Sequence, residues 1–241
     1  MARPEIARTS SPETFEDQRF QKFTSTTVHH LQEPVRMVRV YAEMLQSAPL
    51  GRLDAESLQA VEFVQKAAIQ MQKLLDGLAE YVAALGQPAR EKSLVRLELP
   101  LRQALLQLDP ELKAAGAKVS YAPLPTVYGD FDRLQLVFQH LVRNAVLYRE
   151  GRPPEINVSV RRAGKEWVLG VHDNGPGIAP EFRERIFELY ARLHGKSRPG
   201  NGLGLPVCRA IVEAHGGKIW AEANSGEGAA LFFTLPAEET P

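Results

Sequence analysis

Two long apolar stripes with helical spacing occupy the first third of the chain and constrain its fold most strongly. Apolar side chains recur every three or four residues over 16–47 and again over 58–85, with the helix-breaking stretch "APLGR" between them. This spacing predicts two long helices joined by a short loop, each with a heptad-like seam. A solitary hairpin is the alternative, but it buries two such seams poorly. The pattern therefore favours a homodimeric four-helix bundle built from residues 16–86.

The pattern changes after the polar linker 87–94, where short strand-like and helix-like segments begin to alternate. Asp130 is suited to cap a helix, and Gly164 to form the turn between two strands of alternating polarity. The predicted strands are 95–99, 118–123, two within 155–173, 218–223 and 228–236, and the predicted helices are 100–115, 130–150 and 204–215. This order is typical of an α+β two-layer sandwich. We expect a compact α+β domain over 95–236 after the helical hairpin, with polar ends at 1–15 and 237–241.

Charge and hydropathy narrow the class of protein. The chain's 29 basic and 29 acidic side chains balance, which gives no reason to expect nucleic acid or an anionic membrane as a partner. No apolar run is long enough to cross a bilayer, and the N-terminus lacks the apolar core of a signal peptide. The single cysteine, Cys208, cannot form an internal disulfide and lies in an apolar helical pattern, so we expect it to be packed in a core. These features favour a cytoplasmic protein.

The segment "DNGPGI" at 173–178 places a carboxylate at the predicted end of a strand. Asp173 can there accept a hydrogen bond from an exocyclic amine such as that of adenine. Gly175 and Gly177 allow a tight turn and a close approach of the backbone to a ligand. An ordinary turn is the alternative, because Asp-Asn-Gly is a common turn sequence.

A second glycine cluster, formed by Gly200, Gly202 and Gly204, runs directly into the helix predicted at 204–215. Free N–H groups at a helix start, together with the helix dipole, are suited to hold a phosphate. The cluster lacks the Gly-Lys-Ser/Thr of a Walker motif and the strand and acidic residue of a dinucleotide-binding fingerprint. By itself it is a weak indication of a phosphate site.

One face of the predicted 130–150 helix carries His140, Asn144 and Tyr148, each four residues after the last. A row of polar side chains beside an apolar stripe is typical of a solvated helix face. Asn144 can alternatively place its amide oxygen on Mg²⁺, which prefers few protein ligands and keeps water and phosphate oxygens.

Two adjacent histidines, His29 and His30, lie in the first helical stripe, ahead of Pro34. At about 100° per residue, His29 falls nearly opposite the stripe and His30 roughly 70° from its centre. We therefore expect His29 to point outward, as attack on a bulky ligand requires. Pro34 has no N–H to donate to the carbonyl of His30, so the helix should be loosened there. A metal site on the pair is disfavoured, because adjacent helical side chains diverge and no cysteine or carboxylate cluster joins them.

The order of these motifs resembles that of the two-component sensor histidine kinase family. "HHLQEPVRMV", "IFELYARLHG" and "GNGLGLPVCRAIVEAHGGKIWAE" are most similar to its phytochrome-type branch, and the resemblance covers about residues 16–236. It implies a dimerisation and histidine-phosphotransfer hairpin joined to an ATP-binding domain of the gyrase, Hsp90, histidine kinase and MutL type.

The resemblance also implies roles for individual residues. His29 matches the phosphoacceptor, Asn144 the magnesium-binding asparagine and Asp173 the residue that reads adenine. The other nucleotide-binding positions it implies are Tyr148 near the phosphates, Gly175 and Gly177 in the strand-end loop, Phe187 and Tyr190 where the ATP lid opens, and Gly200, Gly202, Gly204 and Leu205 where it closes.

The implied activity is that of an ATP-dependent protein-histidine kinase with ATP and Mg²⁺ as cofactors. It phosphorylates itself on His29 and passes the phosphoryl group to an aspartate of a separate response-regulator receiver domain. No sensor domain fits before residue 16, so we expect the signal to come from another chain or from a missing part of a longer protein. Glu33 stands where relatives with phosphatase activity have Thr or Asn, so we expect none.

The chain departs from the family pattern at three positions. His30 replaces the acidic residue that follows the phosphoacceptor, His140 replaces an asparagine, and Leu147 replaces a phosphate-binding lysine. As a neutral base, His30 can still accept a proton. The alternative is a degenerate kinase that acts as a histidine phosphotransfer or scaffold protein with weak or no ATP turnover.

Overall fold

The computed structural model describes residues 31–45, 55–86, 92–192, 201–223 and 228–237. Its contacts divide the chain into two compact units, residues 1–75 and 76–241, and each unit is described by itself. His29 and His30 lie outside the described residues. Within the described part of the chain, no helix is both long and apolar enough to cross a bilayer.

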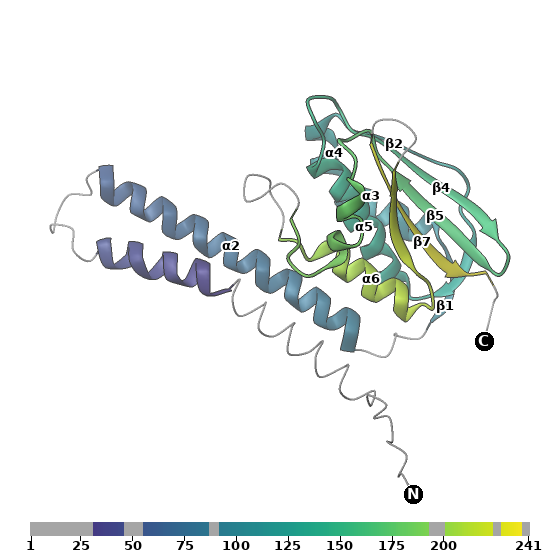
Figure 1. The fold of residues 1–241 in the computed structure, drawn as a ribbon, viewed down its shortest axis with the longest axis horizontal. Coiled ribbons are helices and arrows are strands. Elements are labelled where there is room, and N and C mark those ends of the chain that lie inside the picture. Colours follow the sequence, from purple (N-terminus) through teal and green to yellow (C-terminus); the bar gives the residue numbers. More distant parts are fainter. Residues whose placement is uncertain (1–30, 46–54, 87–91, 193–200, 224–227, 238–241) are drawn as a thin grey trace, which may run out of the picture. The chain divides into compact units, whose positions relative to one another are not determined.

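The first unit contains two helices that lie side by side (Figure 1). The first covers residues 31–45, and the second is the beginning of α2 (Ala55–Gly86). Tyr41 and Phe63 stack across them, with ring centroids 4.6 Å apart and an interplanar angle of 11°. The sequence-predicted pair of long helices is therefore present in the described residues.

The apolar seam of α2 differs in detail from the predicted one. The small residues Ala60 and Ala67 are buried, whereas Leu58 and Leu75 of the predicted seam are 56% and 43% exposed. Small side chains allow two helices to approach closely, which leaves the larger apolar groups of α2 on its outer surface. Several large apolar side chains of this unit are thus available to a further partner.

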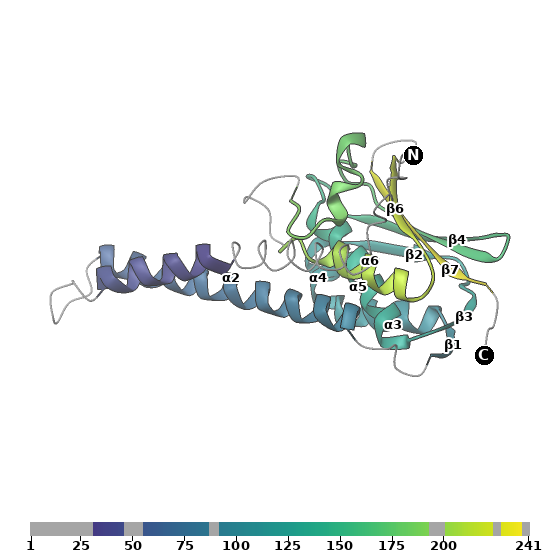
Figure 2. The same ribbon diagram turned by 60° about the horizontal axis from the view of Figure 1, so that its bottom comes forward.

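A five-stranded sheet forms one layer of the second unit, with a strong twist visible in Figure 2. Its order is β2-β4-β5-β7-β6, with β2 parallel to β4 and the other neighbours antiparallel. The strands are β2 (Lys118–Tyr121), β4 (Glu155–Ala163), β5 (Glu166–His172), β6 (Ile219–Ala223) and β7 (Ala229–Pro236). A separate two-stranded sheet pairs β1 (Ser93–Arg96) with β3 (Thr126–Gly129). β1 overlaps the predicted strand 95–99 but begins at Ser93 and ends at Arg96, and the sequence interpretation missed β3.

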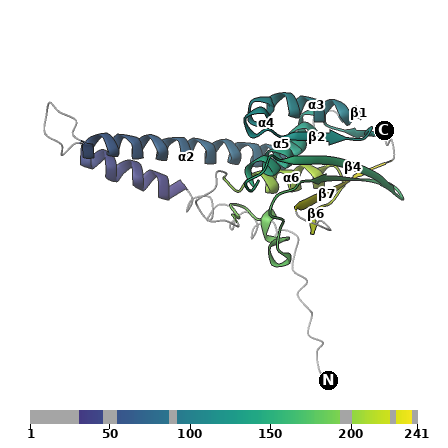
Figure 3. The ribbon, with the colours of Figure 1, turned by 90° about the horizontal axis from the view of Figure 1, so that it is seen from above.

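The helical layer lies on one side of the larger sheet (Figures 1 and 3). It contains α3 (Glu98–Gln107), α4 (Asp109–Ala115), α5 (Phe131–Leu147) and α6 (Gly204–Ala214), and two short 3-10 turns follow β5 at Pro180–Phe182 and Arg185–Phe187. The single helix predicted at 100–115 is wrong. It is divided at Leu108, because Pro110 has no N–H and occupies the first turn of α4 instead.

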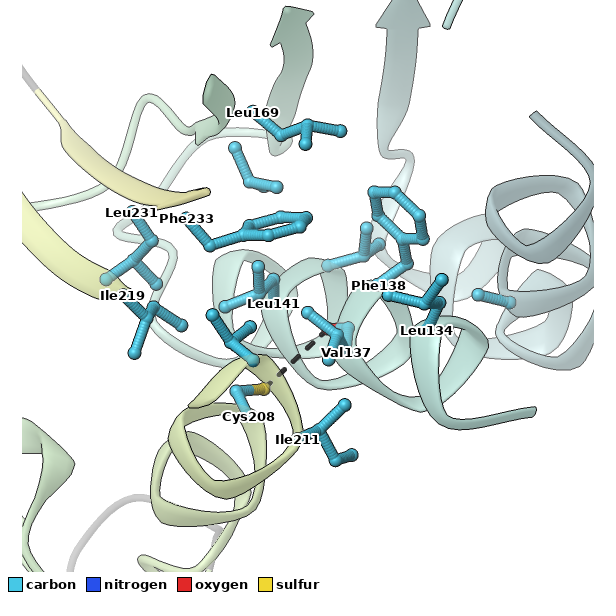
Figure 4. Close-up of a cluster of buried hydrophobic side chains, with 14 of the residues drawn as sticks. Leu134, Val137, Phe138, Leu141, Leu169, Cys208, Ile211, Ile219, Leu231 and Phe233 are labelled. Carbon is cyan, nitrogen blue, oxygen red and sulfur yellow. Dashed lines mark hydrogen bonds between the residues drawn. The ribbon is translucent and has the colours of Figure 1, made fainter. Parts of the chain in front are cut away.

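The core lies between α5, α6 and the sheet (Figure 4). Leu134, Phe138 and Leu141 form the buried stripe of α5, as the sequence predicts. Phe138 meets Phe233 of β7 edge to face, with ring centroids 5.9 Å apart. Cys208 of α6 is fully buried, and its thiol lies 3.8 Å from the carbonyl oxygen of Val137, which confirms its expected packing role.

A buried histidine joins the end of α6 to the start of α5. The Nε2 atom of His215 accepts a hydrogen bond from the backbone N–H of Asp130 at 3.0 Å, and its Nδ1 bonds to the carbonyl oxygen of Ile211 at 2.8 Å. The Asp130 carboxylate caps α5, as predicted, by accepting from the N–H of Arg133 at 3.2 Å. Burial is the main cause that lowers the pKa of His215 below its ordinary value.

Candidate functional site

The site is built around Asp173, which directly follows β5. Its Oδ1 atom accepts hydrogen bonds from the backbone N–H groups of Gly175 at 2.8 Å and Ala229 at 3.0 Å. The other oxygen, Oδ2, makes no hydrogen bond to any residue that the structure describes. One carboxylate oxygen therefore holds the loop, and the other is available to a ligand.

Two glycines let the backbone come close around Asp173. Gly177 has a φ of 81°, and Gly228 has a φ of 122°. A Cβ atom at Gly228 would overlap the carbonyl oxygen of Asp173, so only glycine fits there. The sequence interpretation did not include Gly228, whose role depends on a contact with a residue far away in the chain.

Asn174 braces the same loop from its other side. Its Oδ1 accepts from the N–H of Glu155 at 2.9 Å, and its Nδ2 donates to the carbonyl oxygen of Pro153 at 3.1 Å. The guanidinium of Arg152 donates twice to the Asn174 carbonyl oxygen, at 3.1 and 2.7 Å. These contacts fix the loop to the start of β4, and they too were missed from the sequence.

The predicted polar row of α5 is only partly solvated. His140 is 8% exposed, whereas Asn144 and Tyr148 are half-buried. The carboxamide of Asn144 makes no hydrogen bond to any described residue, so its oxygen is available. The described residues contain no cluster of three or more His, Cys, Asp and Glu side chains that would hold a metal alone. A Mg²⁺ ion held by one amide oxygen, with the remaining ligands from phosphate and water, fits this arrangement.

The second glycine cluster lies where α6 begins. Gly202 has a φ of 69°, and a Cβ there would lie 2.7 Å from the Cα atom of Tyr190. The N–H of Tyr190 donates to the carbonyl oxygen of Gly202 at 2.9 Å, and Tyr190 itself has a φ of 61°. Gly204 is the first residue of α6, whose first N–H groups have no partner within the helix. Leu205 is half-buried beside it, and Gly200 lies outside the described residues.

Phe187 is packed into the protein rather than presented to a ligand. It is 4% exposed, and the guanidinium of Arg209 on α6 lies over its ring, 4.5 Å from the centroid. Arg209 also pairs with Glu184 at 3.2 Å. Phe187 therefore fastens the segment after β5 to α6.

Helix α5 connects the two glycine-bearing segments. At its C-terminal end, a Cβ on Gly175 would lie 3.3 Å from the carbonyl oxygen of Tyr148. Two turns earlier, a Cβ on Gly204 would lie 3.0 Å from Nδ1 of His140. Asn144 lies on the turn between these contacts. The arrangement is suited to an elongated ligand with an amine at Asp173 and anionic groups toward α6.

Comparison with protein families identifies this part of the chain. Residues 129–239 match the model described as "Histidine kinase-, DNA gyrase B-, and HSP90-like ATPase". Cyanobacterial phytochrome A of Nostoc sp. is 36% identical over 216 residues, which are 89% of this chain and 28% of the relative. The adaptive-response sensory kinase SasA of Prochlorococcus marinus is 33% identical over 86% of this chain and 55% of its own length. The chain thus spans between about a quarter and about half of these relatives.

Solved structures agree with this assignment. The catalytic domain of histidine kinase ThkA has a TM-score of 0.54 and 26% identity, over 61% of this chain and 97% of its own. Full-length ShkA in complex with AMPPNP, at 24% identity and a TM-score of 0.60, covers 90% of this chain and 45% of its own. ThkA in complex with the response regulator TrrA, at 20% identity, shares the fold with a TM-score of 0.72 over 97% of this chain and 69% of its own. Residues 129–239 thus form a domain of the histidine kinase-, DNA gyrase B- and HSP90-like ATPase family, and most of the chain is similar to a phytochrome and to a sensory kinase.

Proposed function

We propose that the chain is an ATP-dependent protein-histidine kinase that phosphorylates His29. The observation that carries this proposal is the position of α5, which meets the Asp173 loop at Tyr148 and the glycine cluster at His140. This geometry supports a nucleotide that extends along α5 from base to phosphates. The relative SasA is named a sensory kinase, and the neighbour ShkA was solved in complex with AMPPNP; both support the same ligand.

Each part of the nucleotide has a suitable partner in this site. Oδ2 of Asp173 would accept a hydrogen bond from the adenine amine, while Oδ1 remains bound to the loop. The free N–H groups at the start of α6, beside Gly202 and Gly204, would bind phosphate oxygens. The amide oxygen of Asn144 would bind Mg²⁺, which neutralises phosphate charge.

His29 would act as the nucleophile. A neutral imidazole nitrogen attacks the γ-phosphorus in line, the new N–P bond forms as the bond to the ADP oxygen breaks, and His30 accepts the imidazole proton. The phosphoryl group would then pass to an aspartate of a separate receiver domain. The complex of the neighbour ThkA with a response regulator supports this choice of partner. Since the reaction consumes ATP, we place it in the cytoplasm.

The hairpin over 16–86 would form a homodimer, followed by the linker 87–94 and the catalytic domain 95–236. The exposed apolar side chains of the first unit support this, because a second hairpin would bury them. They are Val35, Val40, Met44, Leu58, Ile69 and Leu75, which are 41% to 57% exposed.

Incubation with γ-labelled ATP tests the kinase reaction. We expect the wild type to acquire an acid-labile label that His29→Ala loses completely and His30→Ala acquires more slowly. The adjacent histidines act as matched controls for each other, because each variant removes one imidazole and the two positions are neighbours in the sequence. Label that survives in His29→Ala would contradict the assignment of the nucleophile.

The substitutions at His30, His140 and Leu147 favour one alternative, a histidine phosphotransfer or scaffold protein with weak or no ATP turnover. Calorimetry with Mg-ATP separates the two functions. Binding together with His29-dependent labelling supports the kinase. Absence of binding, with His29 still phosphorylated by a phosphorylated receiver, would support the alternative.

A further inference from the structure

The last turns of α2 contact the glycine cluster, although no sequence motif connects the two segments. Gly77 and Glu80, three residues apart on α2, are the contact points, and both belong to the unit 76–241. A Cβ on Gly77 would overlap the Asn201 carboxamide and lie 2.9 Å from Cδ1 of Leu203. Asn201 in turn accepts from the N–H of Leu203 at 3.1 Å, just before α6 begins. Gly77 therefore provides the space in which this segment packs on α2.

His140 lies between Glu80 and the first residue of α6. Its Nε2 atom is 3.2 Å from Oε2 of Glu80, an ion-pair distance at which the ring N–H is not aligned for a hydrogen bond. Its Nδ1 atom lies against Gly204, where a Cβ would be 3.0 Å away. An asparagine at position 140 is too short to make both contacts. The imidazole is thus a physical link from α2 to the phosphate end of the site.

This contact also places the negative charge of Glu80 on the side of His140 that faces away from Gly204. The polar contact with His140 lowers the pKa of Glu80 below its ordinary value, against the opposing effect of burial, and the charges of His140 and Arg143 lower it further. Glu80 is therefore a carboxylate at neutral pH. The same charge adds to the effect of burial in raising the pKa of the Cys208 thiol in α6, so its influence extends to that helix.

An ionised carboxylate close to bound phosphates weakens their binding unless a donor compensates it. His140 occupies the position between the two and presents a ring nitrogen to Glu80. Arg143 is half-exposed and paired with Glu111 at 3.4 Å, so it is a weaker compensating group. His140 is therefore placed to decide how strongly Glu80 repels a nucleotide.

We propose that Glu80 and His140 form a charge pair that couples α2 to nucleotide binding. While the pair is closed, His140 supports Gly204 and shields the phosphates from Glu80; displacement of α2 opens the pair and weakens nucleotide binding. Because α2 is one helix from Ala55 to Gly86, a change in its hairpin part reaches the site through this pair. His140 is here a positioning residue, and the proposal rests on the proposed function that this site binds ATP.

Calorimetry with Mg²⁺ and a non-hydrolysable ATP analogue tests the charge pair in the full chain. We expect His140→Asn to weaken binding about 3- to 30-fold, because the unshielded charge of Glu80 acts on the phosphates at an effective dielectric between those of protein and water. The loss should shrink at high salt. Glu80→Gln should bind at least as tightly as the wild type, and the double variant should return close to it.

The matched control is Glu62→Gln, which removes an exposed α2 carboxylate paired with Lys66. It should bind like the wild type. If Glu80→Gln and His140→Asn both weaken binding and their effects add, the two residues are merely structural and the charge pair is refuted. If His140→Asn does not fold, His140→Gln removes the imidazole while retaining a longer polar side chain, and the same loss of affinity is expected.

Amide hydrogen exchange, measured without nucleotide, tests the coupling between α2 and α6 even if the chain does not bind ATP. The first amides of α6 should exchange faster in His140→Asn than in the wild type or Glu62→Gln, because Gly204 loses the imidazole beside it. Unchanged exchange there overturns the coupling. If the wild type binds no nucleotide, the proposed function fails, and the exchange experiment alone decides whether α2 and α6 are coupled.

Discussion

Replacing Asp173 by asparagine separates the two roles of its carboxylate. The side chain keeps its shape, and the amide oxygen can occupy the place of Oδ1, where it would accept from the N–H groups of Gly175 and Ala229. The amide nitrogen then takes the place of Oδ2 and faces the ligand with a donor. The loop should therefore remain formed while the site loses its acceptor for the adenine amine.

The expected magnitudes follow from these contacts. Two charge-assisted hydrogen bonds become neutral ones, which lowers the unfolding free energy by about 1–2 kcal/mol and the Tm by about 2–8 °C. The adenine amine loses its hydrogen bond to a charged acceptor, which reduces the binding free energy by about 1.5–3 kcal/mol. The affinity for ATP should therefore fall about 10- to 150-fold. Inosine triphosphate carries an oxygen at the position of the amine, so it should bind the variant better than ATP does.

Calorimetry with both nucleotides and thermal unfolding provide the test. Asp109→Asn makes the same chemical change at a half-exposed residue of α4 that pairs with Lys113, and both measurements should change little. The reasoning is refuted if Asp173→Asn binds ATP as tightly as the wild type does. It is also refuted if the variant unfolds outright, because Oδ1 would then need its full charge to hold the loop.

Three further predictions concern stability and reactivity. Gly228→Ala should lower the unfolding free energy by about 3 kcal/mol or more, whereas Gly164→Ala, with a φ of 61° and nothing within 4 Å of its Cβ, should cost about 1–2 kcal/mol in urea titrations. The pKa of His215 is lower in the folded protein than in the unfolded chain, so the unfolded chain binds the proton at a higher pH. The unfolding free energy should therefore fall as the pH drops through about 6.5. In His215→Gln this slope in the unfolding free energy should be smaller; an unchanged slope would contradict the role of the bond to Asp130. Burial raises the pKa of the Cys208 thiol, so alkylation should be negligible in the folded protein and appear only with denaturant; rapid labelling of the native protein would contradict this packing.

The parts of the fold that depend on local chemistry could be predicted from the sequence. Asp130 caps α5 because its carboxylate reaches an N–H three residues away, and Gly164 turns the β4–β5 hairpin with a φ of 61°. The buried stripe of α5 follows from helical periodicity alone. Asp173 also lies directly after its strand, because a charged residue followed by glycines ends the alternating pattern.

The remaining features depend on contacts between distant segments. β2 pairs in parallel with β4, and β3 pairs with β1. β1, β2 and β3 are only four residues long, so each offers little pattern of its own. The polar row on α5 did not reveal that Glu80 covers His140, sixty residues along the chain. Gly228 is required because its backbone lies against Asp173, directly after β5, and no local sequence pattern shows this contact. Such features require the three-dimensional partner to be known.

The bond between Tyr190 and Gly202 has a consequence for how the chain tolerates change in length. The N–H of Tyr190 and the carbonyl oxygen of Gly202 meet at 2.9 Å, so the two ends of the intervening stretch are tied together. Once the ends of a loop are fixed, doubling its length costs only about 0.6 kcal/mol in closure entropy. Insertions between positions 192 and 201 should therefore leave the unfolding free energy of the sandwich nearly unchanged. That stretch is the natural place to graft a reporter sequence or a recognition peptide.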